Sequence, residues 1–163
     1  MLALEAICWD PGTGFPSVLE RERDTFFGAH DDPSRTLVAE RDGRLVGYAR
    51  TVAPTPLPEN AHVWTVEGFA VHPAERGHGL APTLLEAVLA QAAQAGVHKV
   101  SLRVLATNPR ARRVYERAGF TVEGVLRDEF VLDGVFVDDV LMARRVATEP
   151  VPGPTSAGSR TTG

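Results

Sequence analysis

The stretch that decides the fold is Val71-His72-Pro73-Ala74-Glu75-Arg76-Gly77-His78-Gly79-Leu80-Ala81-Pro82-Thr83-Leu84-Leu85. An apolar run over residues 62–71 predicts a strand before the turn, and Leu80 begins the clearest helical pattern of the chain, which ends at Ala95. The main-chain N–H groups at the start of a helix have no partners within the helix, and they lie at the positive end of its dipole. This strand–turn–helix unit therefore predicts a site for an anion at the turn.

The turn over residues 76–81, called the glycine turn below, has residues that suit phosphate binding. Gly77 and Gly79 carry no Cβ that would keep phosphate oxygens away from the backbone, and Arg76 adds a positive charge. The spacing differs from the dinucleotide pattern Gly-x-Gly-x-x-Gly, and no Gly-Lys-Ser/Thr follows, as it does in nucleotide hydrolases. Taken by itself, the pattern also fits a glycine-containing helix start that binds no ligand.

The remaining sequence alternates strand and helix patterns. Asp-Gly pairs at 42–43 and 133–134 each separate two apolar alternations, which is the strongest short-range signal of a β-hairpin. Asn108 and Pro109 predict the N-cap and first residue of a second helix, which Gly119 ends. The predicted elements are strands at 2–9, 36–40, 44–52, 62–71, 99–105, 120–132 and 135–146, and helices at 17–29, 80–95 and 108–118.

This order of elements predicts one α/β (α+β) domain over residues 1–146, with helices packed against a mixed sheet. Residues 147–163 are rich in Pro, Gly, Ser and Thr, so we expect a disordered tail. The chain has no run of roughly 18 apolar residues and no basic leader, which favours a cytoplasmic protein without a membrane span. Its single cysteine, Cys8, cannot form an internal disulfide, and no spacing typical of a metal site is present.

Charge is distributed unevenly along the chain. The net charge of −4 argues against a general nucleic-acid-binding protein. Arginines gather over residues 103–117, whereas acidic residues gather over residues 128–139. One interpretation is an anionic ligand near the first group and an amine near the second, and the other is two solvated faces.

Two motifs resemble the signatures of the GNAT superfamily of N-acetyltransferases. Residues 71–85 resemble its cofactor motif, and Asn108-x-x-Ala111-x-x-x-Tyr115-x-x-x-Gly119-Phe120 resembles its second signature at the expected distance. The resemblance covers residues 37–142 and implies a mostly antiparallel mixed sheet that splays after the fourth predicted strand, at 62–71. It also implies that acetyl-CoA is the cofactor, that its pyrophosphate lies on the glycine turn, and that no metal ion takes part.

The activity implied by this resemblance is direct transfer of an acetyl group to a primary amine of a small molecule or a peptide. The alternative is a non-catalytic module of the same fold that binds acyl-CoA as a sensor. A homodimer is common in the family and is a further expectation. Some relatives that acetylate protein N-termini have a Glu where this chain has Arg103, which counts against that subclass.

Two residues are the predicted catalytic groups. By the resemblance, Tyr115 is the general acid that protonates the departing thiolate, although a core aromatic residue would fit the same position. Strand alternation places Thr65, Glu67, Phe69 and Val71 on one face that leads to the glycine turn. Glu67 is therefore the candidate base for the amine, and an exposed strand carboxylate is the alternative.

The resemblance also indicates which residues hold the cofactor. The main chain of the 62–71 strand would pair with the pantetheine arm, Asn108 would add a contact to that arm besides capping its helix, and Arg113 or Arg112 would meet the adenosine phosphate. Pro82 lacks an N–H, which removes one donor worth about 1 kcal/mol, and the hydroxyl of Thr83 is a candidate replacement. The predicted cofactor-binding residues are Phe69, Val71, Arg76, Gly77, His78, Gly79, Ala81, Thr83, Asn108 and Arg113.

Overall fold

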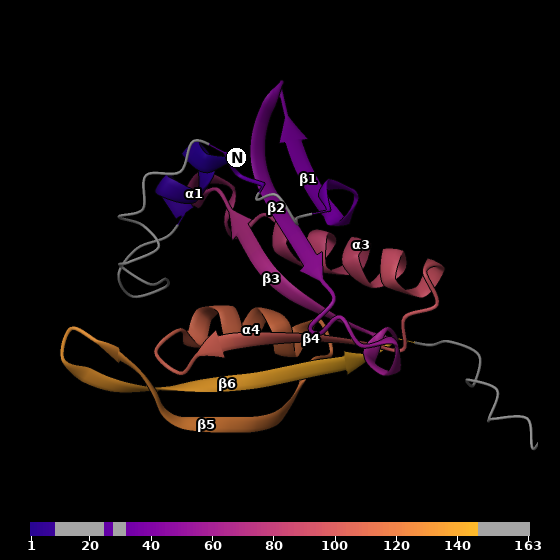
Figure 1. Cartoon of the computed structure of the whole chain (residues 1–163). Coiled ribbons are helices and arrows are strands. Elements are labelled where there is room, and N and C mark those ends of the chain that lie inside the picture. The colour runs from indigo at the N-terminus through magenta and orange to yellow at the C-terminus, as the bar shows by residue number, and fades with distance from the viewer. Residues whose placement is uncertain (9–24, 28–31, 147–163) are drawn as a thin grey trace, which may run out of the picture.

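The computed structural model describes residues 1–8, 25–27 and 32–146, and its main feature is a six-stranded mixed sheet (Figure 1). The spatial order of the strands is β1-β2-β3-β4-β6-β5. β3 and β4 pair in parallel, and the other neighbouring strands of this sheet are antiparallel. The strands are β1 (Thr36–Arg41), β2 (Arg44–Val52), β3 (Val63–Val71), β4 (Lys99–Leu105), β5 (Thr121–Leu132) and β6 (Val135–Arg145). The predicted fold class is confirmed.

Helices α3 (Leu80–Gln94) and α4 (Pro109–Arg117) share the larger hydrophobic core with the sheet. The apolar stripe of α3 includes Leu85 and Val88, which are fully buried against residues of β2, β3 and β4. Burial of each such side chain stabilises the fold by about 1.5–3 kcal/mol. Helix α4 adds Tyr115 to the same core, so its position relative to the sheet is fixed by packing.

Both predicted hairpins are present. Asp42 and Gly43 have φ angles of 51° and 73°, and Asp133 and Gly134 have φ angles of 49° and 77°. Positive φ at both central residues is the geometry of the tight turn whose twist matches that of the strands it joins. These two turns fix the β1–β2 and β5–β6 hairpins that form the two edges of the sheet.

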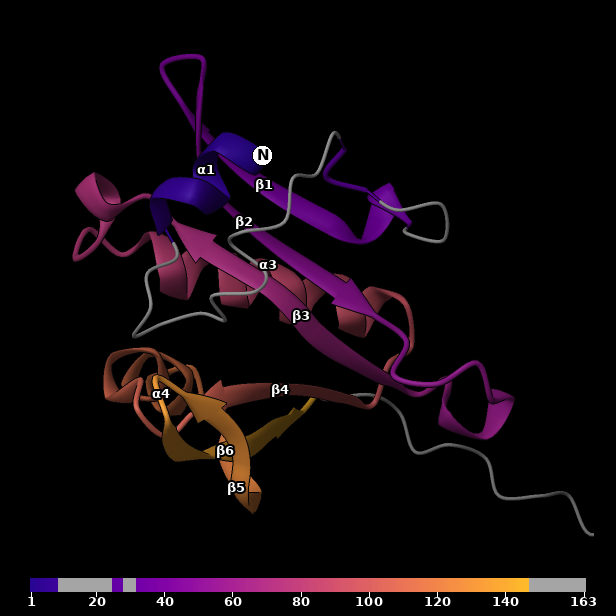
Figure 2. The ribbon, with the colours of Figure 1, turned by 60° about the vertical axis from the view of Figure 1, so that its left-hand side comes forward.

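The sheet splays between β3 and β4. Their paired residues run from Val63–Lys99 to Val66–Leu102, and beyond these pairs the two strands diverge (Figure 2). Residues 67–71 of β3 therefore have no strand next to them on the β4 side. The predicted splay is confirmed, and it follows the third strand of the sheet rather than the fourth.

The strand at 63–71 is the third and not the fourth because residues 2–8 form helix α1 (Leu2–Cys8), whereas the sequence pattern predicted a strand over 2–9. Leu4 and Cys8 lie one helical turn apart and pack against Tyr48 and Ala70, on the face of the sheet opposite α3. A short apolar run cannot be assigned by periodicity alone, and this packing favours the helix.

Two other predictions fall largely outside the described residues. Of the predicted helix at 17–29, only residues 25–27 are described, and they are not helical. The predicted tail at 147–163 lies wholly outside the described residues. Within the described ranges, no helix is long and apolar enough to cross a membrane.

Candidate active site at the splay

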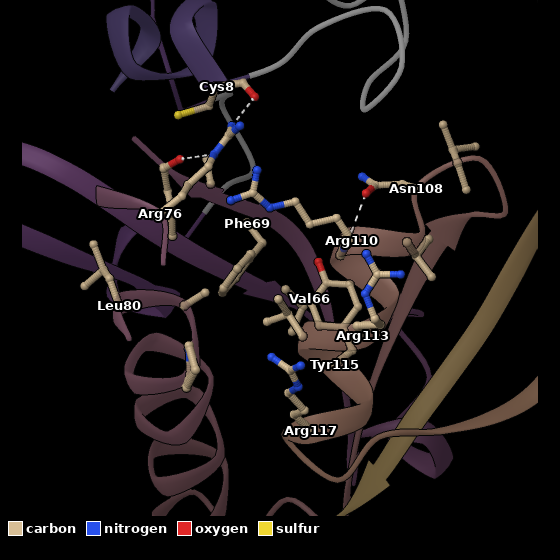
Figure 3. A pocket seen from close by; sticks show the side chains of 18 of the residues that line it. Cys8, Val66, Phe69, Arg76, Leu80, Asn108, Arg110, Arg113, Tyr115 and Arg117 are labelled. Carbon is tan, nitrogen blue, oxygen red and sulfur yellow. Dashed lines mark hydrogen bonds between the residues drawn. The ribbon is translucent and has the colours of Figure 1, made fainter. Parts of the chain in front are cut away.

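A cavity of about 790 Å³ lies where β3 and β4 diverge (Figure 3). Its wall is made by the ends of both strands, the start of α3 and one side of α4. His78 and Thr83 are the two predicted site residues that do not line it. The predicted residues that do are Glu67, Phe69, Val71, Arg76, Gly77, Gly79, Ala81, Asn108, Arg113 and Tyr115.

The glycine turn has the open shape that an anion requires. Gly77 and Gly79 have φ angles of 86° and 84°, where a residue with a Cβ would be strained, and no heavy atom lies within 4 Å of the position a Cβ would take. The first main-chain hydrogen bond of α3 runs from the N–H of Thr83 to the carbonyl of Gly79. The N–H groups of the preceding residues therefore remain at the cavity end of the helix dipole.

Thr83, the candidate replacement for the donor that Pro82 lacks, has its hydroxyl engaged within the helix. Its hydroxyl donates to the carbonyl oxygen of Gly79 at 3.1 Å, inside the helix. A hydroxyl has one proton to donate, so this contact uses it. His78 is exposed on the turn, away from the cavity wall.

Tyr115 combines burial with access to the cavity. Only 8% of the residue is exposed, its ring contacts Phe69 and Phe120, and its hydroxyl points into the cavity (Figure 3). Burial raises the pKa of Tyr115 to about 12. The hydroxyl is therefore protonated at neutral pH and is available as a proton donor.

Glu67 lies on a β-bulge, which changes the face to which it points. The strand pairs Arg50–Gly68 and Thr51–Val66 leave Glu67 as an extra residue in β3. Its carboxylate pairs with Arg50 at 3.0 Å, whereas Phe69 contacts Tyr115 on the opposite face. The prediction that Glu67 and Phe69 share one face is therefore wrong, because an extra residue reverses the alternation. Both side chains still border the cavity.

Helix α4 presents a row of arginines to the cavity. Arg110, Arg113 and Arg117 line it, and their spacing of three and four residues places them on one side of the helix. Arg112 instead pairs with Glu116 at 2.9 Å on the exposed side, so only Arg113 of the two predicted arginines faces the cavity. The same periodicity, applied from Arg113, would have identified the other two arginines.

The N-cap assigned to Asn108 is confirmed. Its Oδ1 accepts a hydrogen bond from the N–H of Ala111 at 3.0 Å. Pro109 follows as the first residue of α4. This cap fixes the start of the helix and places Asn108 itself on the cavity wall.

An ion pair between β4 and β6 also lines the cavity. Asp139 is 2% exposed and accepts a hydrogen bond from Nε of Arg103, whose Nη2 donates to Glu129 at 2.9 Å. Burial alone would lower the pKa of Arg103, but hydrogen bonds and charges of these two carboxylates outweigh it, and the pKa is raised. The guanidinium also lies over the ring of Phe130, 5.8 Å from its centroid. The sequence predicts no individual role for Arg103 or Asp139 beyond their membership of the basic group at 103–117 and the acidic group at 128–139.

The comparisons with known proteins agree with this arrangement. The model of the acetyltransferase (GNAT) family matches residues 2–120. A mycothiol acetyltransferase from Acidimicrobium ferrooxidans is 37% identical over 121 residues, which is 72% of this chain and 37% of that protein. A spermidine N(1)-acetyltransferase from Vibrio cholerae is 30% identical over 67% of this chain and 62% of its own length. The chain thus spans less than two thirds of either relative.

Solved structures give the same result. The protein smu.2055 from Streptococcus mutans UA159 superposes with a TM-score of 0.78 and 28% identity over 90% of this chain and 91% of its own. A Salmonella typhimurium protein, solved with its cofactor acetyl-CoA, has a TM-score of 0.66 and 26% identity over 72% of this chain and 67% of its own. The matching family model and the shared fold show that this chain belongs to the acetyltransferase (GNAT) family.

Proposed function

We propose that this chain transfers the acetyl group of acetyl-CoA directly to a primary amine of a small molecule or a peptide. The observation that carries the proposal is the hydroxyl of the buried Tyr115, directed into the cavity beside the splay. In the reaction the amine nitrogen forms a bond to the thioester carbonyl carbon, and the carbon–sulfur bond breaks. Tyr115 donates its proton to the departing thiolate.

The cavity wall offers groups that fit each part of acetyl-CoA, which supplies the activated acetyl group. The main chain of β3 from Glu67 to Val71 is not paired with β4 and can bond the amides of the pantetheine arm. The glycine turn offers N–H groups and the positive end of the α3 dipole to the pyrophosphate. The α4 arginines add positive charge for the remaining phosphate.

The acidic side of the cavity suits an amine. Glu67 and Asp139 line it, and Glu129 extends the acidic side through its contact with Arg103. An alkylamine has a pKa of about 10.4 and an α-amino group about 7.7–8.0, so an acceptor arrives mostly as a cation and must lose a proton before it attacks. Glu67 is the group we assign to that step, directly or through a water molecule.

A turnover screen tests the proposal. The full chain is incubated with acetyl-CoA and a panel of amino acids, diamines, amino sugars and peptides, and release of the CoA thiol is measured. Thiol release that depends on one class of amine is the expected result. Binding of acetyl-CoA without turnover on any amine would instead support the sensor. The absence of binding at millimolar acetyl-CoA would contradict both.

A further inference from the structure

Arg76 makes contacts that differ from those expected of a phosphate ligand. Its Nε donates to the carbonyl oxygen of Val71, the last residue of β3, at 3.1 Å. Its Nη2 donates to the carbonyl oxygen of Cys8, the last residue of α1, at 2.9 Å. Figure 3 shows the guanidinium between these two carbonyls, above the cavity. One side chain thus joins the start of the glycine turn to the end of a helix 68 residues earlier in the chain.

Helix α1 needs such an anchor. It has seven residues, which is far below the length at which a helix is stable by itself. Its buried residues are Leu4 and Cys8, and its last carbonyls have no partners within the helix. A guanidinium is well suited to such carbonyls because it is charged and has donors in a fixed, forked geometry.

Contacts continue from α1 to the candidate base. Glu5 accepts the hydroxyl proton of Tyr48 at 2.5 Å, and the ring of Tyr48 contacts Phe26 edge to face at 5.1 Å. The guanidinium of Arg50 lies 5.5 Å from the centre of the Phe26 ring and pairs with Glu67. A shift of α1 would therefore move the side chains that surround Glu67, the candidate base for the acceptor amine.

We infer that Arg76 is a positioning residue that couples an occupied glycine turn to the docking of α1, and through α1 to the acceptor side of the cavity. An anion on the turn restrains residues 76–79, and the two carbonyl contacts pass that restraint to the C-terminus of α1. The link between Arg76 and α1 stands on its two hydrogen bonds to the carbonyl oxygens of Val71 and Cys8. Its coupling to acetyl-CoA rests on the proposed function.

The only cysteine of the chain is a built-in reporter of this link. Cys8 is 6% exposed in the docked helix, so its thiol reacts slowly while α1 is in place. Labelling with N-ethylmaleimide, followed by mass spectrometry, measures how often α1 undocks. We expect Arg76→Met to label at least tenfold faster than the unmodified chain, with Arg76→Lys in between because an ammonium keeps the charge but not the fork. Equal rates in all three would overturn the inference.

A matched control separates this effect from general loss of charge. Arg113→Met removes another arginine from the cavity wall but leaves α1 untouched, so its Cys8 labelling rate without ligand should equal that of the unmodified chain. Circular dichroism on every variant checks that the sheet is folded. Fast labelling in Arg113→Met as well would show that charge, and not the link through Arg76, holds α1 in place.

A second labelling experiment is made with saturating acetyl-CoA, which has no free thiol and so does not react with N-ethylmaleimide. We expect protection of Cys8 in the unmodified chain to be severalfold and to disappear in Arg76→Met. Equal protection in both proteins, each at saturation, would mean that the cofactor shields Cys8 directly, and it would overturn the coupling. If acetyl-CoA does not bind the unmodified chain, both the proposed function and the coupling fail. The labelling rates measured without acetyl-CoA still decide whether Arg76 anchors α1.

Discussion

The ring of Phe69 on β3 meets the ring of Tyr115 on α4 edge to face, with the ring centroids 6.0 Å apart. This contact joins the open edge of the splayed sheet to the helix that carries the proposed acid. Such aromatic pairs contribute about 0.5–1.5 kcal/mol beyond the area they bury, so the contact also restrains the Tyr115 ring. The hydroxyl is thereby held beside the strand to which we assign the pantetheine arm.

Removal of that hydroxyl should separate binding from catalysis. We expect Tyr115→Phe to retain its affinity for acetyl-CoA, because the ring keeps its contacts with Phe69 and Phe120. The value of kcat should fall by about 10²–10⁴ if the phenol protonates the thiolate. Calorimetry with acetyl-CoA and thiol-release kinetics measure the two quantities. An unchanged kcat would show that Tyr115 is only a core residue.

The same hydroxyl gives a pH signature in stability. Burial raises the pKa of Tyr115 to about 12 from its ordinary value of 10.0. Below pH 10 both the folded and unfolded chains are protonated at this group, so its contribution to stability is fully present there. Between pH 10 and 12 the unfolded chain loses the proton first, and the free energy of unfolding should fall by about 2–3 kcal/mol.

Urea denaturation across this range measures the effect. Tyr115→Phe cannot titrate, so its stability should fall less steeply than that of the unmodified chain over the same pH interval. Parallel curves for the two proteins would contradict the raised pKa. The comparison is made between variants, because other groups of the chain also titrate at high pH.

The sequence was sufficient where a local motif determines the structure. The Asp-Gly turns, the Asn-Pro start of α4 and the bounds of β4 at 99–105 all follow from neighbouring residues. The helix at 2–8 could not be assigned in this way, because its docking on Tyr48 and Ala70 is a contact with distant parts of the chain. The bulge at Glu67 likewise depends on how β2 pairs with β3.

The place of Asp139 in the cavity wall could not be predicted either, because it also depends on how distant strands pair. Three residues of β5, 127–129, lie opposite Asp138 alone, and this irregularity brings Glu129 and Phe130 next to Arg103. Asp128 has a φ of 52° at this irregularity, but an Asp with no Gly beside it is a weak signal in the sequence. The charge pattern at 128–139 predicts either a place for an amine or a solvated face, and the structure places the most buried of these residues, Asp139, in the cavity wall.

The Arg103–Asp139 pair should respond differently to loss of each partner. Asp139 is buried, whereas 48% of the Arg103 side chain is exposed. Arg103→Met leaves a buried carboxylate without its cation, so we expect a loss of about 3–5 kcal/mol. Asp139→Asn leaves Arg103 in contact with Glu129 and water, so the loss should be about 1–3 kcal/mol. Denaturant midpoints measure both, and a larger loss in Asp139→Asn would contradict this view of the pair.

Pro82 gives a prediction of improved binding. It lies in the first turn of α3, where an N–H would face the proposed pyrophosphate, and proline has none. We expect Pro82→Ala to strengthen acetyl-CoA binding by about 1 kcal/mol, or roughly fivefold in Kd. Its free energy of unfolding should fall by about 0.4–1 kcal/mol, because the unfolded chain gains freedom.

The control for Pro82→Ala is Thr83→Val at the next position. The Thr83 hydroxyl already donates to Gly79, so its removal should leave the Kd for acetyl-CoA unchanged. Calorimetry on both variants decides whether the Thr83 hydroxyl stays on Gly79 or turns to the cofactor. If Thr83→Val weakens binding and Pro82→Ala does not strengthen it, then the hydroxyl leaves Gly79 when the cofactor binds. In that case Thr83 supplies the donor that proline removes.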